Sequence, residues 1–309
     1  MASLAAATAS TTVNTTDDTI KISDCVIQNE SQQDFATSGT SKSGQFQYLV
    51  VADSHGRGIK KNYYTFRFAN LNWASFLEEE DWKEQLENIC NIPTSSRIGT
   101  TFSCIKIYQT HFEITWIGDS SIKIYKKGAG EILEDGREGS LLVWQTKDHD
   151  YDNAEDITQL RKIKRNSLPT VSAWTIKSAW DIHASSPTVM LSNKAKNFTH
   201  YTGECTNMTR CLGHNGVFSR ALGMVTEIVP RESTLEYFKI VAGSDGFWQV
   251  MCDEDQEFIV DNSSEVLAEK ARGRWEQDWT HDNSMGTLTK NVKIPAHNWD
   301  DIAVATWSN

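Results

Sequence analysis

FQYLVVADSHG, residues 46–56, is the most informative segment of this 309-residue chain. Its first half is apolar and rich in β-branched residues, which is typical of a buried strand. Its second half is polar and brings Asp53, Ser54 and His55 up to Gly56. We therefore expect a buried strand that delivers a carboxylate and an imidazole at its C-terminal end.

Two other segments share this design, with an Asp at or beside the end of an apolar strand. They are Ile240–Asp245 (IVAGSD) and Asp300–Val304 (DDIAV). Any one of these Asp residues could be a turn former or a helix cap. Several carboxylates that met in one place would repel each other unless a divalent cation neutralised them. Hard oxygen ligands favour Mg²⁺ or Mn²⁺, so the joint pattern favours a site for one of these metals.

The remaining pattern predicts strands interleaved with a few helices. Strands are expected over residues 101–108, 112–117, 239–242 and 302–307, and helices over 71–92, 153–165 and after Ser263. Residues 166–209 have a weak pattern and are the best candidate for an insertion or flap. Residues 1–20 are rich in Ala, Ser and Thr, which predicts a disordered N-terminal tail. We expect residues 21–309 to form one α+β domain.

Composition excludes several classes of function. The chain has 30 Lys and Arg against 41 Asp and Glu, a net charge of −11, so it has no general attraction for nucleic acid or an anionic membrane surface. It contains no run of about 18 apolar residues that could span a membrane. The six cysteines form no CxxC pair, and the start of the chain lacks the charge pattern of a signal peptide. We expect reduced thiols and an intracellular location, cytoplasmic or nuclear.

Seven short motifs then occur in a characteristic order. They are Gln33-Asp34, Asp53-Ser54-His55-Gly56, Gly99-Thr100-Thr101, Gly118-Asp119-Ser120, Lys147-Asp148-His149, Ser244-Asp245-Gly246-Phe247-Trp248 and Asp300-Asp301-Ile302-Ala303-Val304. In this order the chain resembles the metal-dependent serine/threonine phosphatases of type 2C, the PPM family. Each motif alone is weak, but together they extend over nearly the whole chain.

The resemblance implies a fold, a metal site and a reaction. The fold would be an α-β-β-α arrangement, in which two central antiparallel sheets pack as a sandwich with helices outside. The metal site would hold two tightly bound Mg²⁺ or Mn²⁺ ions and a third, weaker one. Its implied ligands are Asp34, Asp53, the backbone carbonyl of Ser54, Asp119, Asp245 and Asp300. The implied reaction is hydrolysis of phosphoserine or phosphothreonine on proteins by metal-activated water, with His55 as the general acid; we expect a monomer.

The sequence also departs from the family pattern. Asn29 stands where the family carries a phosphate-binding Arg, and Gln249 stands where an Asp serves the third metal. Ser54 replaces a Gly, and Ser121 replaces an Arg. Arg57 could take the place of the missing phosphate-binding Arg. A further family motif matches either Thr209–His214 or Ser219–Met224, and both lack its final Asp. Gln33 also stands where many members carry an acid. Asn29, Gln33 and Gln249 favour an alternative, a pseudophosphatase in which the same fold acts as a binding or regulatory module.

Overall fold

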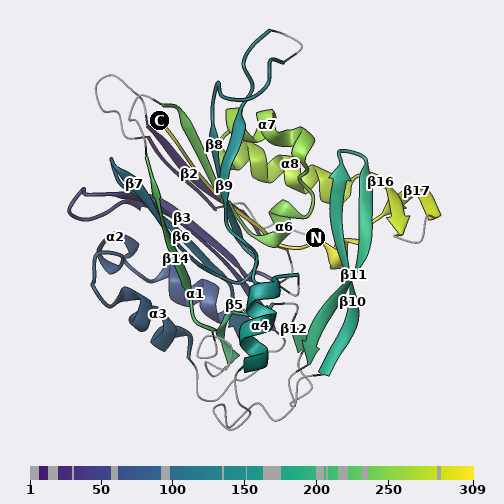
Figure 1. Ribbon diagram of the computed structural model, residues 1–309, viewed down its shortest axis with the longest axis horizontal. Helices are drawn as coiled ribbons and strands as arrows, with labels where there is room; N and C mark the ends of the chain where they lie inside the picture. Colours follow the sequence, from purple (N-terminus) through teal and green to yellow (C-terminus); the bar gives the residue numbers. More distant parts are fainter. Residues whose placement is uncertain are drawn as a thin grey trace.

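The computed structural model describes residues 7–12, 20–29, 31–56, 62–91, 98–133, 136–150, 152–162, 175–199, 205–206, 208–214, 222–231, 236–283 and 287–309. Two large antiparallel sheets lie face to face in the middle of the molecule, with helices on both outer sides (Figure 1). The α-β-β-α fold class expected from the sequence is therefore confirmed.

The seven-stranded sheet contains the segment that carries Asp53. Its strands, in spatial order, are β13 (Leu212–Gly213), β5 (Ile98–Thr100), β4 (Gln47–Gly56), β6 (Phe102–Ile107), β7 (His111–Ile117) and β14 (Val225–Pro230), and β3 (Asp34–Thr40) pairs with β4. Residues 49–52 of β4 are fully buried, which agrees with an apolar run that is covered on both faces.

The six-stranded sheet contains the two other strands that end near an Asp. Its order is β1 (Ala7–Thr12), β2 (Lys21–Ile27), β18 (Ile302–Ser308), β15 (Phe238–Gly243), β8 (Ser121–Lys126) and β9 (Leu141–Gln145). Between the two sheets, side chains with a two-residue period interdigitate, such as Phe112, Ile114 and Trp116 of β7. This inner layer holds the two sheets in a fixed relative position, and with them the strand ends.

Three short helices cover the outer face of the seven-stranded sheet. They are α1 (Tyr63–Ala69), α2 (Trp73–Phe76) and α3 (Trp82–Cys90), and they bury an aromatic cluster against β3 and β6. The sequence predicted one helix over residues 71–92, whereas the structure has two. Residues 78–81 are all acidic and follow the C-terminal end of α2, where negative charge is unfavourable. The same charges precede α3, where they favour a new helix start.

The outer face of the six-stranded sheet is covered by the helices α6 (Asp245–Trp248), α7 (Gln256–Asp261) and α8 (Ser264–Glu276), with the 3₁₀ turn η3 (Asp253–Asp255) between the first two. Ser263 is the N-cap residue of α8, as the sequence predicted. A buried ion pair between Arg274 and Asp255 ties α8 to η3, with 2.5 Å between Nη2 and Oδ1.

A third sheet lies to one side of the sandwich (Figure 1). It is formed by β10 (Thr175–Ser186), β11 (Val189–Thr199), β16 (Asp278–Asn283) and β17 (Thr287–Lys293), and β12 (Cys205–Thr206) pairs with β11. The hairpin β10–β11 falls within residues 166–209, where the sequence predicted an insertion or flap. Residues 166–174, 200–204 and 207 lie outside the described part of the chain.

One sequence expectation does not hold at the N-terminus. Residues 7–12, expected to be part of a disordered tail, form β1 and pair with β2 in antiparallel register. The physical reason is that β2 would otherwise be an edge strand with unpaired backbone groups, which a Ser/Thr-rich strand can satisfy. The other residues of the first 19 lie outside the description. Among the described residues, no helix is long and apolar enough to cross a membrane.

A buried ion pair fixes the segment before β13. The Arg210 guanidinium contacts the Asp156 carboxylate of α4 (Ala154–Lys162) with two nitrogens, and the Thr209 hydroxyl donates to the same carboxylate. The Asp156 and Arg210 side chains are only 1% and 8% exposed. In another part of the chain, the 3₁₀ turn η4 (Ala296–Asn298) precedes β18. The Arg210–Asp156 pair holds residues 208–214 against the end of the sandwich.

Replacing Asp156 with Asn should destabilise the fold by about 3–5 kcal/mol, because it leaves the Arg210 charge buried and uncompensated. Urea denaturation of the full chain measures the free energy of unfolding. The control is Asp261→Asn, which breaks an exposed ion pair with Lys127. The Asp261 side chain is 46% exposed and the Lys127 side chain is 41% exposed. That loss should stay below about 1 kcal/mol. Equal losses in the two variants would contradict the anchoring role of Asp156.

Candidate metal centre

Asp34 and Asp53 face each other across two paired strands. In the antiparallel register of β3 and β4, Asp34 lies directly opposite Asp53. Asp34 is almost completely buried. Like charges in directly opposite positions of a sheet are destabilising, so this pair is costly unless a proton or a cation neutralises it.

Asp245 and Asp300 come from the other sheet. Asp245 is the first residue of α6, directly after β15, and Asp300 precedes β18. Ser244 joins the two segments, because its N–H donates to the Ala303 carbonyl and its hydroxyl accepts from the Ala303 N–H, both at 3.0 Å. Gly246 is required there, since a Cβ atom on it would lie 2.1 Å from the Asp301 carbonyl oxygen.

The carboxylates influence one another electrostatically. Burial raises the pKa of Asp53 well above its usual range, and the nearby Asp34, Asp245 and Asp300 raise it further. Burial also raises the pKa of Asp34, with contributions from Asp301 and Asp300. For Asp300, burial and then Asp245 raise the pKa. Four of the carboxylates predicted from the sequence therefore lie close enough to raise one another's pKa values.

Asp34 provides the test of whether this site suits a cation. Ser244 and Asp53 approach it closely enough to lower its pKa slightly. Neither meets hydrogen-bond geometry, however, so both carboxylate oxygens are buried without a hydrogen-bond partner in the described part of the molecule. A buried acceptor of this kind is expensive unless something binds it. An all-oxygen set of carboxylates is what Mg²⁺ and Mn²⁺ prefer, so the residues present fit such an ion.

These carboxylates do not converge on a single point. Among the described residues, the only three side chains whose ligand atoms all lie within 4.8 Å of one another are His55, Cys211 and His214. The acidic groups around Asp53 instead act on one another through their charges, which raise their pKa values. Such a spread set cannot enclose one ion alone, and hard cations commonly complete their coordination with water.

Asp119 extends the acidic region. It follows β7 in a turn where Gly118 has φ +100°, a conformation that favours glycine. Burial raises the pKa of Asp119 well above its usual range, and Asp245 and Asp148 raise it further. Asp148, for which the sequence predicted no role, has a pKa raised to about 6 by burial, partly offset by a hydrogen bond from Ser121. The motif Lys147-Asp148-His149 was the feature of the sequence that could have pointed to Asp148.

Ser54, Gln249 and Asn29 occupy positions at which the sequence departs from the family. Ser54 lies within the extended strand β4, so the positive φ that would strain a serine does not occur. The Gln249 amide donates to Asp245 Oδ2 over 3.1 Å. The side-chain amide of Asn29 donates a hydrogen bond to the backbone carbonyl of Asp300, which fixes its position. Arg57 lies outside the described residues, as does the first half of the Ser219–Met224 motif.

His55 lies at the end of β4, and its imidazole stacks on that of His214 with 5.0 Å between ring centroids. Burial lowers the pKa of His55 well below its usual range, and His214 lowers it further. His214 and Cys211 belong to the Thr209–His214 motif. The sequence analysis assigned no chemistry to either, because their proximity to His55 depends on strand pairing between distant segments.

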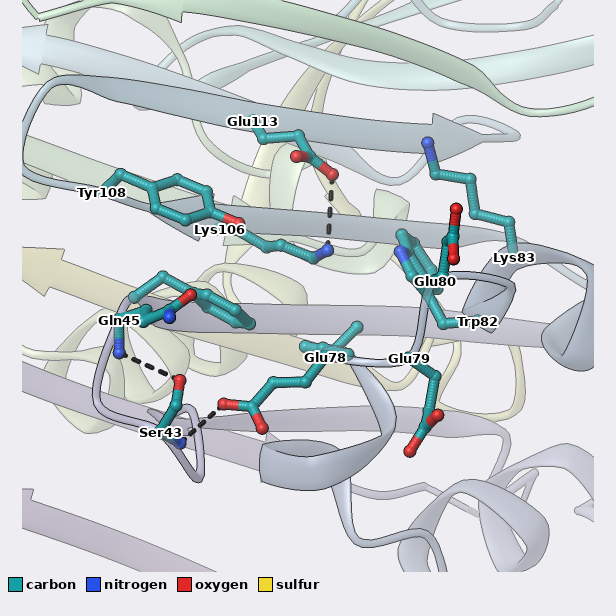
Figure 2. Close-up of a pocket in the computed structure, with 12 residues that line it drawn as sticks. Ser43, Gln45, Glu78, Glu79, Glu80, Trp82, Lys83, Lys106, Tyr108 and Glu113 are labelled. Atoms are coloured by element: carbon teal, nitrogen blue, oxygen red, sulfur yellow. Dashed lines mark hydrogen bonds and ion pairs between the residues drawn. The ribbon is translucent and has the colours of Figure 1, made fainter.

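A separate pocket lies at the opposite end of the seven-stranded sheet (Figure 2). It has a volume of about 550 Å³ and is lined by residues of the β3–β4 turn, the α2–α3 turn, β6 and β7. In Figure 2, Lys106 reaches towards Glu113, with 3.4 Å between Nζ and Oε1. Lys106 pairs with Tyr48, five residues before Asp53, or roughly 16 Å along the strand. This pocket is therefore distinct from the carboxylates.

Comparison with known proteins supports the fold assignment. Structural neighbours over nearly the whole chain are serine/threonine phosphatases of type 2C. They include the Streptococcus agalactiae serine/threonine phosphatase (TM-score 0.50, 15% identity, covering 93% of this chain and 98% of that one). Another is the Toxoplasma gondii serine-threonine phosphatase 2C (TM-score 0.50, 11% identity, covering 98% and 99%). At such low identity the likeness shows the fold alone.

A Caenorhabditis elegans sex determining protein also shares the fold, with a TM-score of 0.50 and 15% identity, covering 94% of this chain and 64% of that one. No family model matches the sequence, and no curated protein matches it. The resemblance seen in the seven motifs is thus confirmed by structural neighbours at the level of the fold.

Protein stripped of divalent cations should lose stability as the pH rises, and Asp53→Asn should reduce that loss. With a raised pKa, folded Asp53 keeps its proton above about pH 4, where the unfolded chain releases it. The stabilising contribution is therefore complete below about pH 4 and is lost as the pH rises towards the folded pKa. Asn has no such proton. Urea denaturation with chelator from pH 5 to 8 measures this slope.

The control for this experiment is Asp261→Asn, which removes an exposed carboxylate outside the cluster. It should follow the wild-type slope. Parallel slopes for wild type and Asp53→Asn would contradict the mutual repulsion inferred for the cluster.

Proposed function

We propose that this protein is a Mg²⁺- or Mn²⁺-dependent phosphatase that acts on phosphoserine or phosphothreonine in proteins. The observation that carries the proposal is that Asp53 lies directly opposite the buried Asp34 and interacts electrostatically with Asp245 and Asp300, on a fold shared with serine/threonine phosphatases. A proton or a bound metal cation neutralises such a group of carboxylates, and we assign this role to Mg²⁺ or Mn²⁺.

In the proposed site, Asp34, Asp53, Asp245 and Asp300 would hold two ions, with the carbonyl of Ser54 as a further ligand. When bound, such ions supply an activated water molecule and neutralise charge on the phosphoryl group. The carboxylates of Asp53 and its neighbours fix where this charge lies, because they project from the ends of paired strands. Water remains necessary in the site, so its edge must stay open to solvent.

His55 is the proposed general acid. Burial favours its neutral form in the metal-free protein, as its lowered pKa indicates. A phosphate dianion beside the ring would favour the imidazolium form and raise that pKa. His55 could then donate its proton to the leaving serine or threonine oxygen. This role depends on the distance between the imidazole and the leaving group, which the rigid end of β4 would set.

A second candidate function is that of a pseudophosphatase, which binds a partner without hydrolysing phosphate. It is favoured by Asn29, which replaces the phosphate-binding Arg of the family and is held by the Asp300 carbonyl. A neutral amide in that position cannot form a bidentate, charge-assisted contact with phosphate. Metal binding without turnover of an aryl phosphate or a phosphopeptide would favour this candidate.

Replacing Asp245 with Asn should lower kcat/KM for Mn²⁺-dependent hydrolysis of an aryl phosphate by about 100-fold or more, or roughly 2.7 kcal/mol. The reason is that it removes a negative ligand from the proposed metal pair. Calorimetric titration with Mn²⁺ should show a weakened site in the same variant. Asp261→Asn is the control and should match wild type in both measurements. Activity within tenfold of wild type would rule out a ligand role for Asp245.

The third, weaker metal gives a second test. Asp119 approaches Asp245, but the neighbouring Gln249 offers an amide in place of a carboxylate. Activity should therefore require Mg²⁺ or Mn²⁺ beyond saturation of the tight pair, because oxygen sites weaken with fewer charged ligands. Gln249→Asp should lower that requirement, as measured by activity against metal concentration. If Gln249→Asp leaves the curve unchanged, and activity saturates with the tight pair, Asp119 is a turn residue only.

A further inference from the structure

A second set of metal-ligating side chains lies beside the acidic region. The Nε2 atoms of His55 and His214 are 2.9 Å apart. Cys211 completes the set, and the three ligand atoms all lie within 4.8 Å of one another. Cys211 is fully buried and His214 is only 7% exposed. The carboxylates offer only oxygen, whereas this set offers two imidazole nitrogens and one sulfur.

Backbone pairing positions all three residues. β5 lies between β4 and β13, and Gly99 of β5 pairs with His55 on one side and Gly213 on the other. Cys211 and His214 flank the two residues of β13 directly. Three neighbouring strands therefore bring together ligands that are more than 150 residues apart in sequence.

The backbone of Gly99 lies directly against the two imidazoles. A Cβ atom on Gly99 would lie 2.4 Å from His55 Nε2 and 2.5 Å from His214 Nε2. His214 has φ +48°, in the left-handed region that non-glycine residues rarely adopt, and it follows Gly213 at φ +83°. Strain of this kind is found where the surrounding structure must aim a side chain.

The donor set matches zinc in type and in size. Zinc binds imidazole nitrogen at about 2.0–2.1 Å and thiolate at about 2.3 Å, so two nitrogens on a tetrahedral ion are roughly 3.3 Å apart. The observed 2.9 Å requires only a small opening. Mg²⁺ and Mn²⁺ favour oxygen ligands over this set.

We infer that His55, Cys211 and His214 form a second metal site, specific for zinc and similar thiophilic divalent cations, with water in the fourth position. Binding releases the Cys211 thiol proton to solvent and leaves the thiolate as the ligand. Because the ion occupies Nε2 of His55, that nitrogen can no longer carry a proton for the leaving group. Zinc therefore inhibits hydrolysis, a consequence that rests on the proposed function, whereas zinc binding itself does not.

Cobalt absorption spectroscopy tests the site without reference to activity. The full chain is stripped with chelator, placed in excess Mg²⁺ to saturate the carboxylates, and titrated with Co²⁺. One equivalent should produce a thiolate-to-cobalt charge-transfer band, and Zn²⁺ should abolish it by displacement. Cys211→Ser should remove the band and weaken zinc binding at least tenfold, and His214→Ala should weaken it similarly. The matched control is Cys104→Ser, a buried thiol in β6 outside the set, which should retain both.

Gly99→Ala provides a variant that keeps all three ligands. Its added methyl group should push the imidazoles apart and weaken zinc binding at least tenfold. Loss of the band in Cys104→Ser but not in Cys211→Ser would overturn the assignment. Should the variants fail to fold, the wild-type titration decides alone, because the absence of a thiolate band at one equivalent of Co²⁺ also overturns the proposal.

Activity measurements separate this inference from the proposed function. With Mn²⁺ saturating, one equivalent of Zn²⁺ should reduce aryl phosphate hydrolysis by wild type at least tenfold, and by Cys104→Ser equally. A stoichiometric thiolate band in a protein that hydrolyses no phosphate ester would support the zinc site and contradict the proposed phosphatase. Hydrolysis without any thiolate band would support the phosphatase and contradict the zinc site.

Discussion

The constraint on which this structure depends is the burial of like charges against each other at the end of a β-sandwich. Asp34 lies opposite Asp53 in adjacent strands, and Asp245 and Asp300 approach from the facing sheet. Such an arrangement opposes folding, so the rest of the molecule must hold it in place. The inner layer between the sheets does so, because its side chains fill the space behind these strand ends. The site is an unfavourable electrostatic arrangement on a favourable apolar framework.

Two adjacent carboxylates, Asp300 and Asp301, have different surroundings. Asp301 accepts hydrogen bonds from the backbone of Asn29 and Gln33 and from the Ser31 hydroxyl, so its charge is satisfied by one turn. Asp300, next to it, interacts with Asp245 and contributes to the raised pKa of Asp53. Asp301 also raises the pKa of Asp34, so both carboxylates act on the acidic region.

The sequence predicted those parts of the structure that depend on local pattern. The strand ending at Asp53 and the alternation of Phe112, Ile114 and Trp116 follow from hydrophobic periodicity. The sandwich fold was implied by the resemblance to type 2C phosphatases that the seven motifs carry. The sequence did not predict the split between α2 and α3, which depends on charge at helix ends, nor β1, whose pairing satisfies the edge of β2. It also missed Cys211 and His214 as partners of His55, because their proximity is created by β5, which pairs with both segments.

Strand geometry also links the two kinds of ligand. Side chains of β4 alternate between its faces, so Asp53 and His55 project to the same side while Ser54 projects to the other. One oxygen ligand, Asp53, and one nitrogen ligand, His55, are therefore neighbours on one face of β4. Asp119, which interacts with Asp245, also raises the pKa of the buried Cys211 thiol, although burial is the larger cause. A charge bound at the carboxylates must therefore change the electrostatic potential at His55, Cys211 and His214, and the reverse is also true. A cation among the carboxylates reduces the negative potential that would attract a second cation to His55, and by linkage the reverse also holds.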